Sequence, residues 1–224
     1  MNKASSILLF TVLAALAVAL GYAVIFLPEQ AEGLATAVSD QMGNSGVDHS
    51  VTAVLLNFRG YDTLLEMAVL LLALIGVWSL APQSRAETIS IPPASPVLLA
   101  LFRLLIPLMI LVAGYLLWVG AHAPGGAFQA GAVLAAAGVL ALLCGKRLEG
   151  RLAGWPLRFG LVLGTAMFVA VAAAVMVGGA HLLQYPLEWA GGLILLIEAA
   201  ATFSIGVTLM ALFFGVRPIT DQRP

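Results

Sequence analysis

Long apolar stretches separated by short polar loops dominate this sequence. Six of them meet or approach the roughly 20 residues that a helix needs to cross a hydrocarbon layer about 30 Å thick. The fourth is short, and the sixth is long enough to tilt or to continue past the membrane surface. The sequence therefore predicts about six transmembrane helices, over residues 7–27, 61–80, 97–119, 128–144, 155–180 and 186–215.

Composition excludes the soluble classes of protein. Hydrophobic residues make up 62% of the 224 residues and charged residues 9%, against roughly 25% charged residues in a typical soluble domain. So few charges cannot cover the water-facing surface of a soluble globule of this size. A soluble enzyme, a disordered tail and a nucleic-acid-binding module are excluded, and we expect an all-α polytopic membrane helix bundle.

The first apolar stretch has one feature of a cleaved signal peptide, because Lys3 precedes it. It is longer than the roughly 7–15 residues of a signal-peptide core, and no small-residue cleavage site follows it closely. We therefore expect it to be retained as a membrane span.

The charges of the loops predict the orientation of the bundle. Cytoplasmic loops carry an excess of Lys and Arg. The loop after the first stretch is acidic and that after the fourth is basic, and the same alternation holds along the chain. Both termini are therefore predicted to be cytoplasmic. The acidic loop holds Glu29, Glu32, Asp40 and Asp48, and the basic loop holds Lys146, Arg147, Arg151 and Arg158.

A proline-rich linker divides the chain, because proline has no N–H donor and cannot continue a helix. We predict a two-span segment at residues 1–82, a cytoplasmic linker at 83–96 and a four-span domain at 97–224. Residues 51–58 form a shorter apolar run, which is either the first part of the second helix or a separate half-helix.

Three charged residues lie close together at the start of the second span. Asp62 and Glu66 are four residues apart and share one face of a helix, and Arg59 can pair with Asp62. A polar outer end of the span explains Arg59 and Asp62 equally well. It explains Glu66 less well, since Glu66 lies more than a turn deeper and must face protein or water.

Glu198 is a lone carboxyl near the middle of the last span. An ionisable group at this depth costs at least about 2.5–3.5 kcal/mol and is a functional hypothesis by default. The alternative is a protonated, purely structural Glu that is hydrogen-bonded to a neighbouring helix. For Arg103, a side chain that reaches the cytoplasmic surface is favoured over a pair with Glu198.

A tight turn separates the third and fourth spans. Pro124, Gly125 and Gly126 force the turn, and Gly131 with other small residues suits close helix packing. Irregular backbone at membrane depth is tolerated only where protein or water surrounds it. His122 in this turn can pass protons at an aqueous mouth, although a solvent-facing histidine without a role is the commoner case.

The spacing of the histidine and cysteine residues predicts no metal site. His49, His122 and His181 are too dispersed to predict one. The single cysteine, Cys144, excludes an intrachain disulfide and is expected to be a small buried hydrophobe.

These motifs resemble two parts of a known family. The run from Val51 to Glu66 resembles the carboxy-terminal region of the A subunit of Mrp-type multisubunit sodium/proton antiporters. It is equally similar to the small equivalent subunit of membrane-bound hydrogenases. The turn from His122 to Gly131 resembles the antiporter B subunit. The chain thus looks like a B subunit fused behind an A-subunit tail, and the two resemblances cover nearly all of it.

Four positions depart from the pattern of the family. Asn57 stands where the family usually has Asp, which removes one titratable site. Leu65, Ala127 and Ala130 replace glycines, so the turns are expected to be stiffer. The retained charged residues are Arg59, Asp62 and Glu66.

The resemblance implies a multi-pass subunit of a hetero-oligomeric antiporter complex in the inner cell membrane, which exchanges Na⁺ for H⁺. Larger partner subunits would provide the main proton channels. Glu66 and Glu198 would relay protons or Na⁺, for which carboxylate oxygens are suitable ligands, and Arg59 would hold Asp62 ionised. The resemblance implies a transporter subunit that is not an enzyme. No redox cofactor is expected, because the sequence lacks ligands for one.

Two other interpretations stay open. In the first, the chain is the equivalent subunit of the ion-translocating module of a membrane-bound hydrogenase or a complex-I-like respiratory complex. In the second, it is a structural scaffold without a direct role in transport. A stand-alone transporter is disfavoured, because intramembrane polar residues are scarce and no internal repeat is evident.

Overall fold

The computed structural model describes residues 3–27, 33–80, 94–145 and 154–214, and it contains helices and no strand within those ranges. Two compact units are present, Met1–Ala37 and Val38–Pro224. Most of the predicted linker at 83–96, most of the basic loop after the fourth span, the acidic residues Glu29 and Glu32, and the last ten residues lie outside the described ranges.

The first unit contains helix α1 (Lys3–Ile25), an apolar helix of membrane-spanning length. Its side chains are exposed along the described length, as expected of a helix that is apolar on all sides and has lipid around it. The hydroxyl of Thr11 donates to the carbonyl of Ile7, which satisfies its polar atom within the helix. A short helix α2 (Ala35–Gln41) crosses the boundary between the units.

The second unit begins with three short helical pieces: η1 (Met42–Asn44), α3 (Ser50–Ala53) and the π-helical turn η2 (Val54–Phe58). The long helix α4 (Gly60–Leu80) follows after a break at Arg59. The hydroxyl of Thr63 donates to the carbonyl of Leu55 at 2.6 Å and ties the two pieces together. Of the two alternatives for residues 51–58, the structure therefore shows the separate half-helix.

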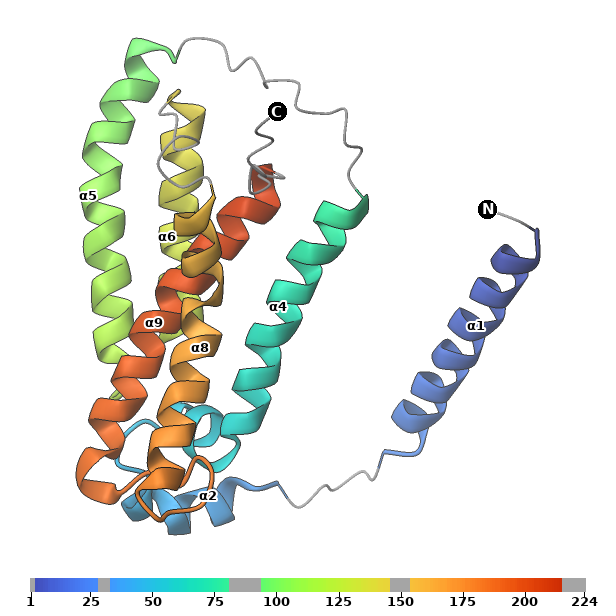
Figure 1. Ribbon diagram of the computed structural model, residues 1–224, viewed down its shortest axis with the longest axis vertical. Helices are drawn as coiled ribbons and strands as arrows, with labels where there is room; N and C mark the ends of the chain where they lie inside the picture. Colours follow the sequence, from blue (N-terminus) through green and yellow to red (C-terminus); the bar gives the residue numbers. More distant parts are fainter. Residues whose placement is uncertain (1–2, 28–32, 81–93, 146–153, 215–224) are drawn as a thin grey trace. The chain divides into compact units, whose positions relative to one another are not determined.

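Four further helices complete this unit: α5 (Pro96–Val119), α6 (Ala127–Leu143), α8 (Trp155–Val177) and α9 (Leu187–Phe214). Successive helices run in opposite directions (Figure 1). Within the described ranges, five helices are long and apolar enough to cross a membrane: α1, α4, α5, α8 and α9. Helix α6 has 17 residues, or roughly 25 Å of length. This confirms the predicted all-α membrane bundle and its short fourth span.

Helix α9 lies at the centre of the second unit and packs against α6, α8 and α4. Its buried residues include Ala190, Ile194, Ile197, Ala201 and Ile205. Small residues let the backbones approach: a Cβ atom at Gly131 of α6 would lie 2.8 Å from Ile205 Cγ2. Such close contacts stabilise helix pairs where lipid supplies no hydrophobic driving force.

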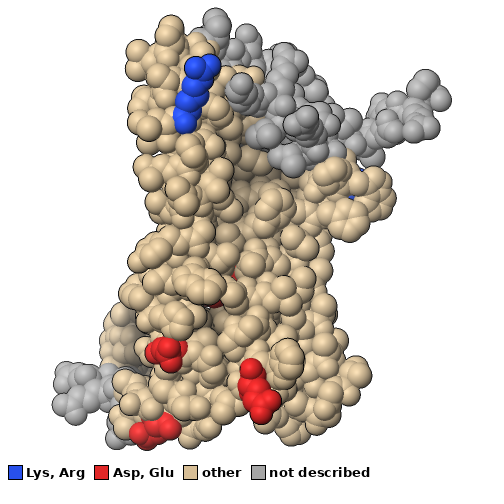
Figure 2. All heavy atoms as spheres, turned by 90° about the vertical axis from the view of Figure 1, so that its left-hand side faces the viewer, with Lys and Arg blue, Asp and Glu red and all other residues tan. Residues whose placement is uncertain are grey.

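Most of the described charged residues of the second unit lie toward the two ends of the bundle, although Arg59 pairs with Asp62 at one end and Glu198 lies within the bundle. Figure 2 shows Lys or Arg near one end and Asp or Glu toward the other. Asp62 and Glu188 lie in the first turns of α4 and α9, at the end that also carries Asp48. We call this the acidic end. Arg103 is exposed near the start of α5, at the opposite end, in keeping with a side chain that reaches the membrane surface.

Candidate functional site

Glu198 is buried at the contact between α9 and the start of α6. Its side chain is 4% exposed, although it is the ionisable group deepest in the apolar helix. The backbone N–H of Ala127, the first residue of α6, donates to its carboxyl group. Its second oxygen, Oε2, is buried and has no hydrogen-bond partner within the described chain. The carboxyl group is therefore held on one side and free on the other.

The carboxyl group of Glu198 lies against the turn formed by Pro124, Gly125 and Gly126. Gly126 precedes α6 with φ of 107°, a conformation that only glycine adopts readily. A Cβ atom at this position would lie 2.7 Å from Glu198 Oε1 and 3.8 Å from Gln129 Oε1. The amino terminus of α6 has no side-chain cap of its own. Glu198 thus supplies an acceptor oxygen to the free N–H groups at the amino terminus of α6.

The other residues of the turn contact neighbouring backbone and side chains, but not the carboxyl group of Glu198. A Cβ atom at Gly125 would lie 2.5 Å from the carbonyl oxygen of Leu116, so this glycine permits a close backbone approach. Pro124 is exposed, and Gly131 contacts α9 at Ile205 and Thr202. Of the four predicted turn and packing residues, Gly126 is the one that meets the buried carboxyl.

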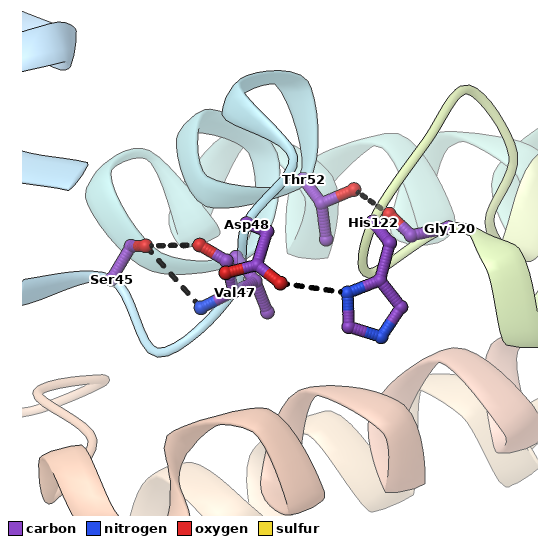
Figure 3. Close-up of polar contacts among 6 residues, drawn as sticks. All are labelled: Ser45, Val47, Asp48, Thr52, Gly120 and His122. Atoms are coloured by element: carbon purple, nitrogen blue, oxygen red, sulfur yellow. Dashed lines mark hydrogen bonds and ion pairs between the residues drawn. The ribbon is translucent and has the colours of Figure 1, made fainter. Parts of the chain in front are cut away.

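The segment from Ser45 to Ala53 covers this turn at the acidic end (Figure 3). The backbone N–H groups of Asp48 and His49 both donate to the carbonyl of Ala121. The buried hydroxyl of Thr52 donates to the carbonyl of Gly120. Gly46 packs on α9, because its carbonyl oxygen would lie 2.9 Å from a Cβ atom at Gly191. The front part of the chain therefore closes the outer side of the turn.

Asn57 shows what the departure from the family pattern does here. Its side-chain N–H donates to the carbonyl of Ser45 at 2.8 Å. An ionised Asp has no donor and could not make this bond. The hydroxyl of the fully buried Ser45 in turn lies 2.8 Å from the carbonyl of Val47. Asn57 therefore anchors the covering segment rather than acting as a titratable site.

His122 contacts Asp48 at the edge of the covering segment. Its Nδ1 atom lies 2.9 Å from Asp48 Oδ2, and the two side chains are 60% and 82% exposed. Proton transfer at His122 stays a prediction. Among the described residues, no three His, Cys, Asp or Glu side chains gather to hold a metal ion.

These contacts predict unequal effects on stability. Asp48→Asn weakens an exposed pair and is expected to change the free energy of unfolding by about 0–1 kcal/mol. Thr52→Val removes the buried donor to Gly120 and is expected to cost about 1–3 kcal/mol. Melting of the purified complex in detergent should therefore separate the two variants. Equal melting temperatures would mean that the covering segment does not depend on the Thr52 bond.

The remaining charged candidates are Arg59, Asp62 and Glu66, which lie just before α4 or in its first two turns. Arg59 Nη2 lies 2.5 Å from Asp62 Oδ2, which confirms that the two can pair. Glu66 is exposed on the surface of the second unit, in contrast to the buried Glu198. The structure thus places the two candidate relay carboxylates in different surroundings. His49 Nδ1 lies 3.3 Å from the hydroxyl of Thr52 in the covering segment, and the backbone N–H of His181 donates to the side chain of Gln184. Cys144 is buried as expected.

Two residues near the buried carboxyl were not identified from the sequence. Gln129 places its side-chain oxygen beside Gly126, and Thr202 lies one helical turn after Glu198 with a buried hydroxyl that has no partner in the described chain. The spacing of four between Glu198 and Thr202 is a signal that sequence reading could have used.

Comparison with known proteins gives two families for consecutive parts of the chain. Residues 97–217 match the family described as "Domain related to MnhB subunit of Na+/H+ antiporter". Residues 2–95 match the MbhE family, which is described as a subunit of MBH. These matches confirm the resemblance to an antiporter B subunit behind an A-subunit-like segment. No curated protein matches the chain.

Two solved structures share the fold. A chain of the membrane-bound sulfane sulfur reductase, an archaeal respiratory membrane complex, matches with a TM-score of 0.67 and 23% identity over 94% of this chain and 97% of that chain. A chain of the Mrp complex from Dietzia sp. DQ12-45-1b matches with a TM-score of 0.58 and 20% identity. It covers 100% of this chain and 27% of that one.

The chain is thus a multi-pass membrane protein whose helices have the arrangement found in two multisubunit membrane complexes. The first family match spans residues 97–217, more than half of the 224 residues. This chain belongs to the family of domains related to the MnhB subunit of Na⁺/H⁺ antiporters.

Proposed function

We propose that this chain is a subunit of a cation/proton antiporter complex of the inner cell membrane, in which Na⁺ leaves in exchange for H⁺ and Glu198 relays protons. Larger partner subunits provide the main proton channels. The family match over residues 97–217 supports the antiporter assignment. The likeness to chains of two multisubunit complexes supports partner subunits.

The buried carboxyl of Glu198 carries the proposal. A carboxyl at membrane depth costs at least about 2.5–3.5 kcal/mol, so it is retained where it has a function. The N–H of Ala127 holds one side of the carboxyl group, and the buried Oε2, without a partner in the described chain, leaves one position at which a proton can bind. A purely structural Glu would be expected to have both oxygens satisfied.

The deciding experiment measures antiport in inverted membrane vesicles after the Glu198→Gln substitution. Glutamine keeps the shape of the side chain and an acceptor for the N–H of Ala127 but cannot titrate. Loss of antiport with a fully assembled complex supports the relay. Unchanged antiport favours the scaffold interpretation.

We assign a second part of the proton route to Glu66, Asp62 and His122. Glu66 is exposed on α4 at a depth where lipid alone would be unfavourable, so we assign its face to a partner subunit or to water. Arg59 holds Asp62 ionised at the entrance of this face. His122, with Asp48, lies at the acidic end and exchanges protons with bulk water.

Glu66→Gln is expected to lower antiport by about tenfold, because it removes one proton-transfer group but leaves Glu198 in place. Asp40→Asn is the control, since Asp40 is exposed on the short helix α2 and lies outside the predicted spans. The measurement is the initial rate of antiport in vesicles with equal amounts of complex. Equal rates for the two variants would remove Glu66 from the route.

The match of residues 2–95 to the MbhE family, and the similarity to an archaeal respiratory complex, support a second candidate. In that case the chain serves the ion-translocating module of a membrane-bound hydrogenase or a related respiratory complex. Purification in mild detergent and identification of the bound subunits distinguish the two. Redox subunits with metal clusters would indicate the respiratory complex, and antiporter subunits alone would indicate the antiporter.

A further inference from the structure

The first two turns of α8 lie at the end of the bundle opposite the acidic end. Their inner side is fixed by a buried apolar cluster, in which Leu157 is 2% exposed and lies with Leu74 of α4 and Val207 of α9. Leu74 and Val207 come late in two helices that begin at the acidic end. Because α8 has the length and composition of a membrane span, its start lies where such a helix meets the headgroup layer of a bilayer.

The outer side of the same turns carries two large aromatic side chains and one cation. Trp155 and Phe159 are 71% and 68% exposed, and their ring centres lie 6.1 Å apart. The guanidinium carbon of Arg158, which is also exposed, lies 5.8 Å from the centre of the Trp155 ring. We call Trp155, Arg158 and Phe159 the aromatic–basic face of α8.

The charge of Arg158 is not neutralised within the described part of the chain. The salt bridges among the described residues do not include it. An arginine that stacks on an aromatic ring keeps the N–H donors in its plane free, and their fork geometry matches a phosphate group. An unpaired cation also favours a ligand with a net negative charge over a zwitterion, whose own cation it repels. Arg158 is therefore suited to a phosphate group of net negative charge.

The position of the face indicates that this phosphate belongs to a lipid. Tryptophan is enriched where membrane helices cross the interface, because its ring contacts acyl chains while its N–H bonds to polar groups. The sequence just before α8 is basic, since Lys146, Arg147 and Arg151 outnumber Glu149. Lys and Arg clusters beside a membrane helix attract anionic lipids. The charges of this part of the chain are thus complementary to an anionic membrane surface.

We propose that the aromatic–basic face of α8 binds one anionic phospholipid of the adjoining leaflet. Arg158 donates to the phosphate group, and the indole N–H of Trp155 donates to a phosphate or ester oxygen. Phe159 lies four residues, or about 6 Å, further along the helix, where its ring contacts the upper part of an acyl chain. The order of polar and apolar groups along α8 thus follows that of a phospholipid. This site is independent of the proposed relay at Glu198.

The test measures which lipid contacts Trp155 in the assembled complex, reconstituted into vesicles. Brominated acyl chains quench tryptophan fluorescence on contact, and the difference between the wild type and Trp155→Phe gives the signal of Trp155. Brominated phosphatidylglycerol in phosphatidylcholine is compared with brominated phosphatidylcholine in phosphatidylglycerol. We expect half-maximal quenching at an about fivefold lower mole fraction of the brominated phosphatidylglycerol, the preference that one interfacial charge supplies.

Arg158→Gln removes the charge, so the two brominated lipids should then quench Trp155 equally. Assembly should be retained, because the side chain of Arg158 is exposed. Arg103→Gln is the matched control, since it makes the same change at another exposed arginine near this end of the bundle, on α5. The fivefold preference should persist in this control.

Three results would overturn the proposal. Equal quenching by the two lipids in the wild type would do so without any arginine variant, as would an unchanged preference in Arg158→Gln. Protection of Trp155 from both lipids would mean that a partner subunit covers this face. Because the measurement reports lipid contact, none of these results depends on antiport or on Glu198.

Discussion

Antiport in inverted vesicles is expected to fall on the order of 100-fold when Glu198 is replaced by glutamine, the size of effect that follows loss of a proton-transfer group. The substitution keeps an oxygen that accepts the N–H of Ala127 and fills the same space beside Gly126. Assembly of the complex should therefore be retained.

Glu188→Gln provides the control for this experiment. Glu188 lies in the first turn of the same helix, α9, and is exposed at the acidic end. The same chemical change at that position should leave antiport close to the wild-type rate. Antiport is followed as the change of a pH-sensitive dye on addition of Na⁺, at equal amounts of assembled complex. Equal loss in both variants would show a general effect of charge on the bundle, and full activity in both would leave Glu198 as a structural residue.

Much of the fold could be predicted because it depends on features that can be read directly along the sequence. The length of an apolar run and the charges beside it fix the number of helices and the short fourth span without any contact being known. The break at Arg59 was visible only as one of two alternatives. A π-helical turn over Val54–Phe58 and the bond from Thr63 to Leu55 decide it, and neither has a local sequence signature.

The site could be predicted in its parts but not in its assembly. Glu198 stands out because it is a lone carboxyl in an apolar run, and Gly126 because it follows Pro124 and Gly125 in a forced turn. That the two meet depends on how α6 and α9 pack, which periodicity does not reveal. The same holds for Thr202, since its sequence does not show that its hydroxyl lacks the backbone partner that Thr208 has.

The covering segment illustrates the same limit. The acidic loop was predicted as an outer, solvent-facing connection, and Asp48 is indeed exposed. The neighbouring Thr52 and Ser45 are nevertheless buried, because they satisfy backbone groups of the turn and of their own loop. From the sequence alone, a polar residue in a loop is expected to be solvated. The sequence does not reveal that Thr52 has a distant partner in Gly120.

Gly126→Ala is expected to be the most damaging single change in the site. The added Cβ atom would lie 2.7 Å from Glu198 Oε1, and alanine at φ of 107° is strained by about 1–3 kcal/mol in addition. The carboxyl must then leave the amino terminus of α6, which loses its cap and the buried hydrogen bond at a further cost of about 1–3 kcal/mol. We expect a several-fold lower yield of assembled complex and loss of antiport in the fraction that assembles.

A double-variant cycle separates two effects of Gly126→Ala: the steric clash of the new Cβ atom with Glu198, and the backbone strain at position 126. Glu198→Ser removes the atoms that a Cβ at position 126 would strike, so combining it with Gly126→Ala should cost less than the sum of the two single changes by about 1 kcal/mol or more. Gly192→Ala in α9 is the control, since a Cβ there has no neighbour within 4 Å. Thermal melting of the purified complexes gives the four values. Strict additivity would mean that Gly126 is needed only for its backbone conformation, and that the carboxyl of Glu198 is not seated against this turn.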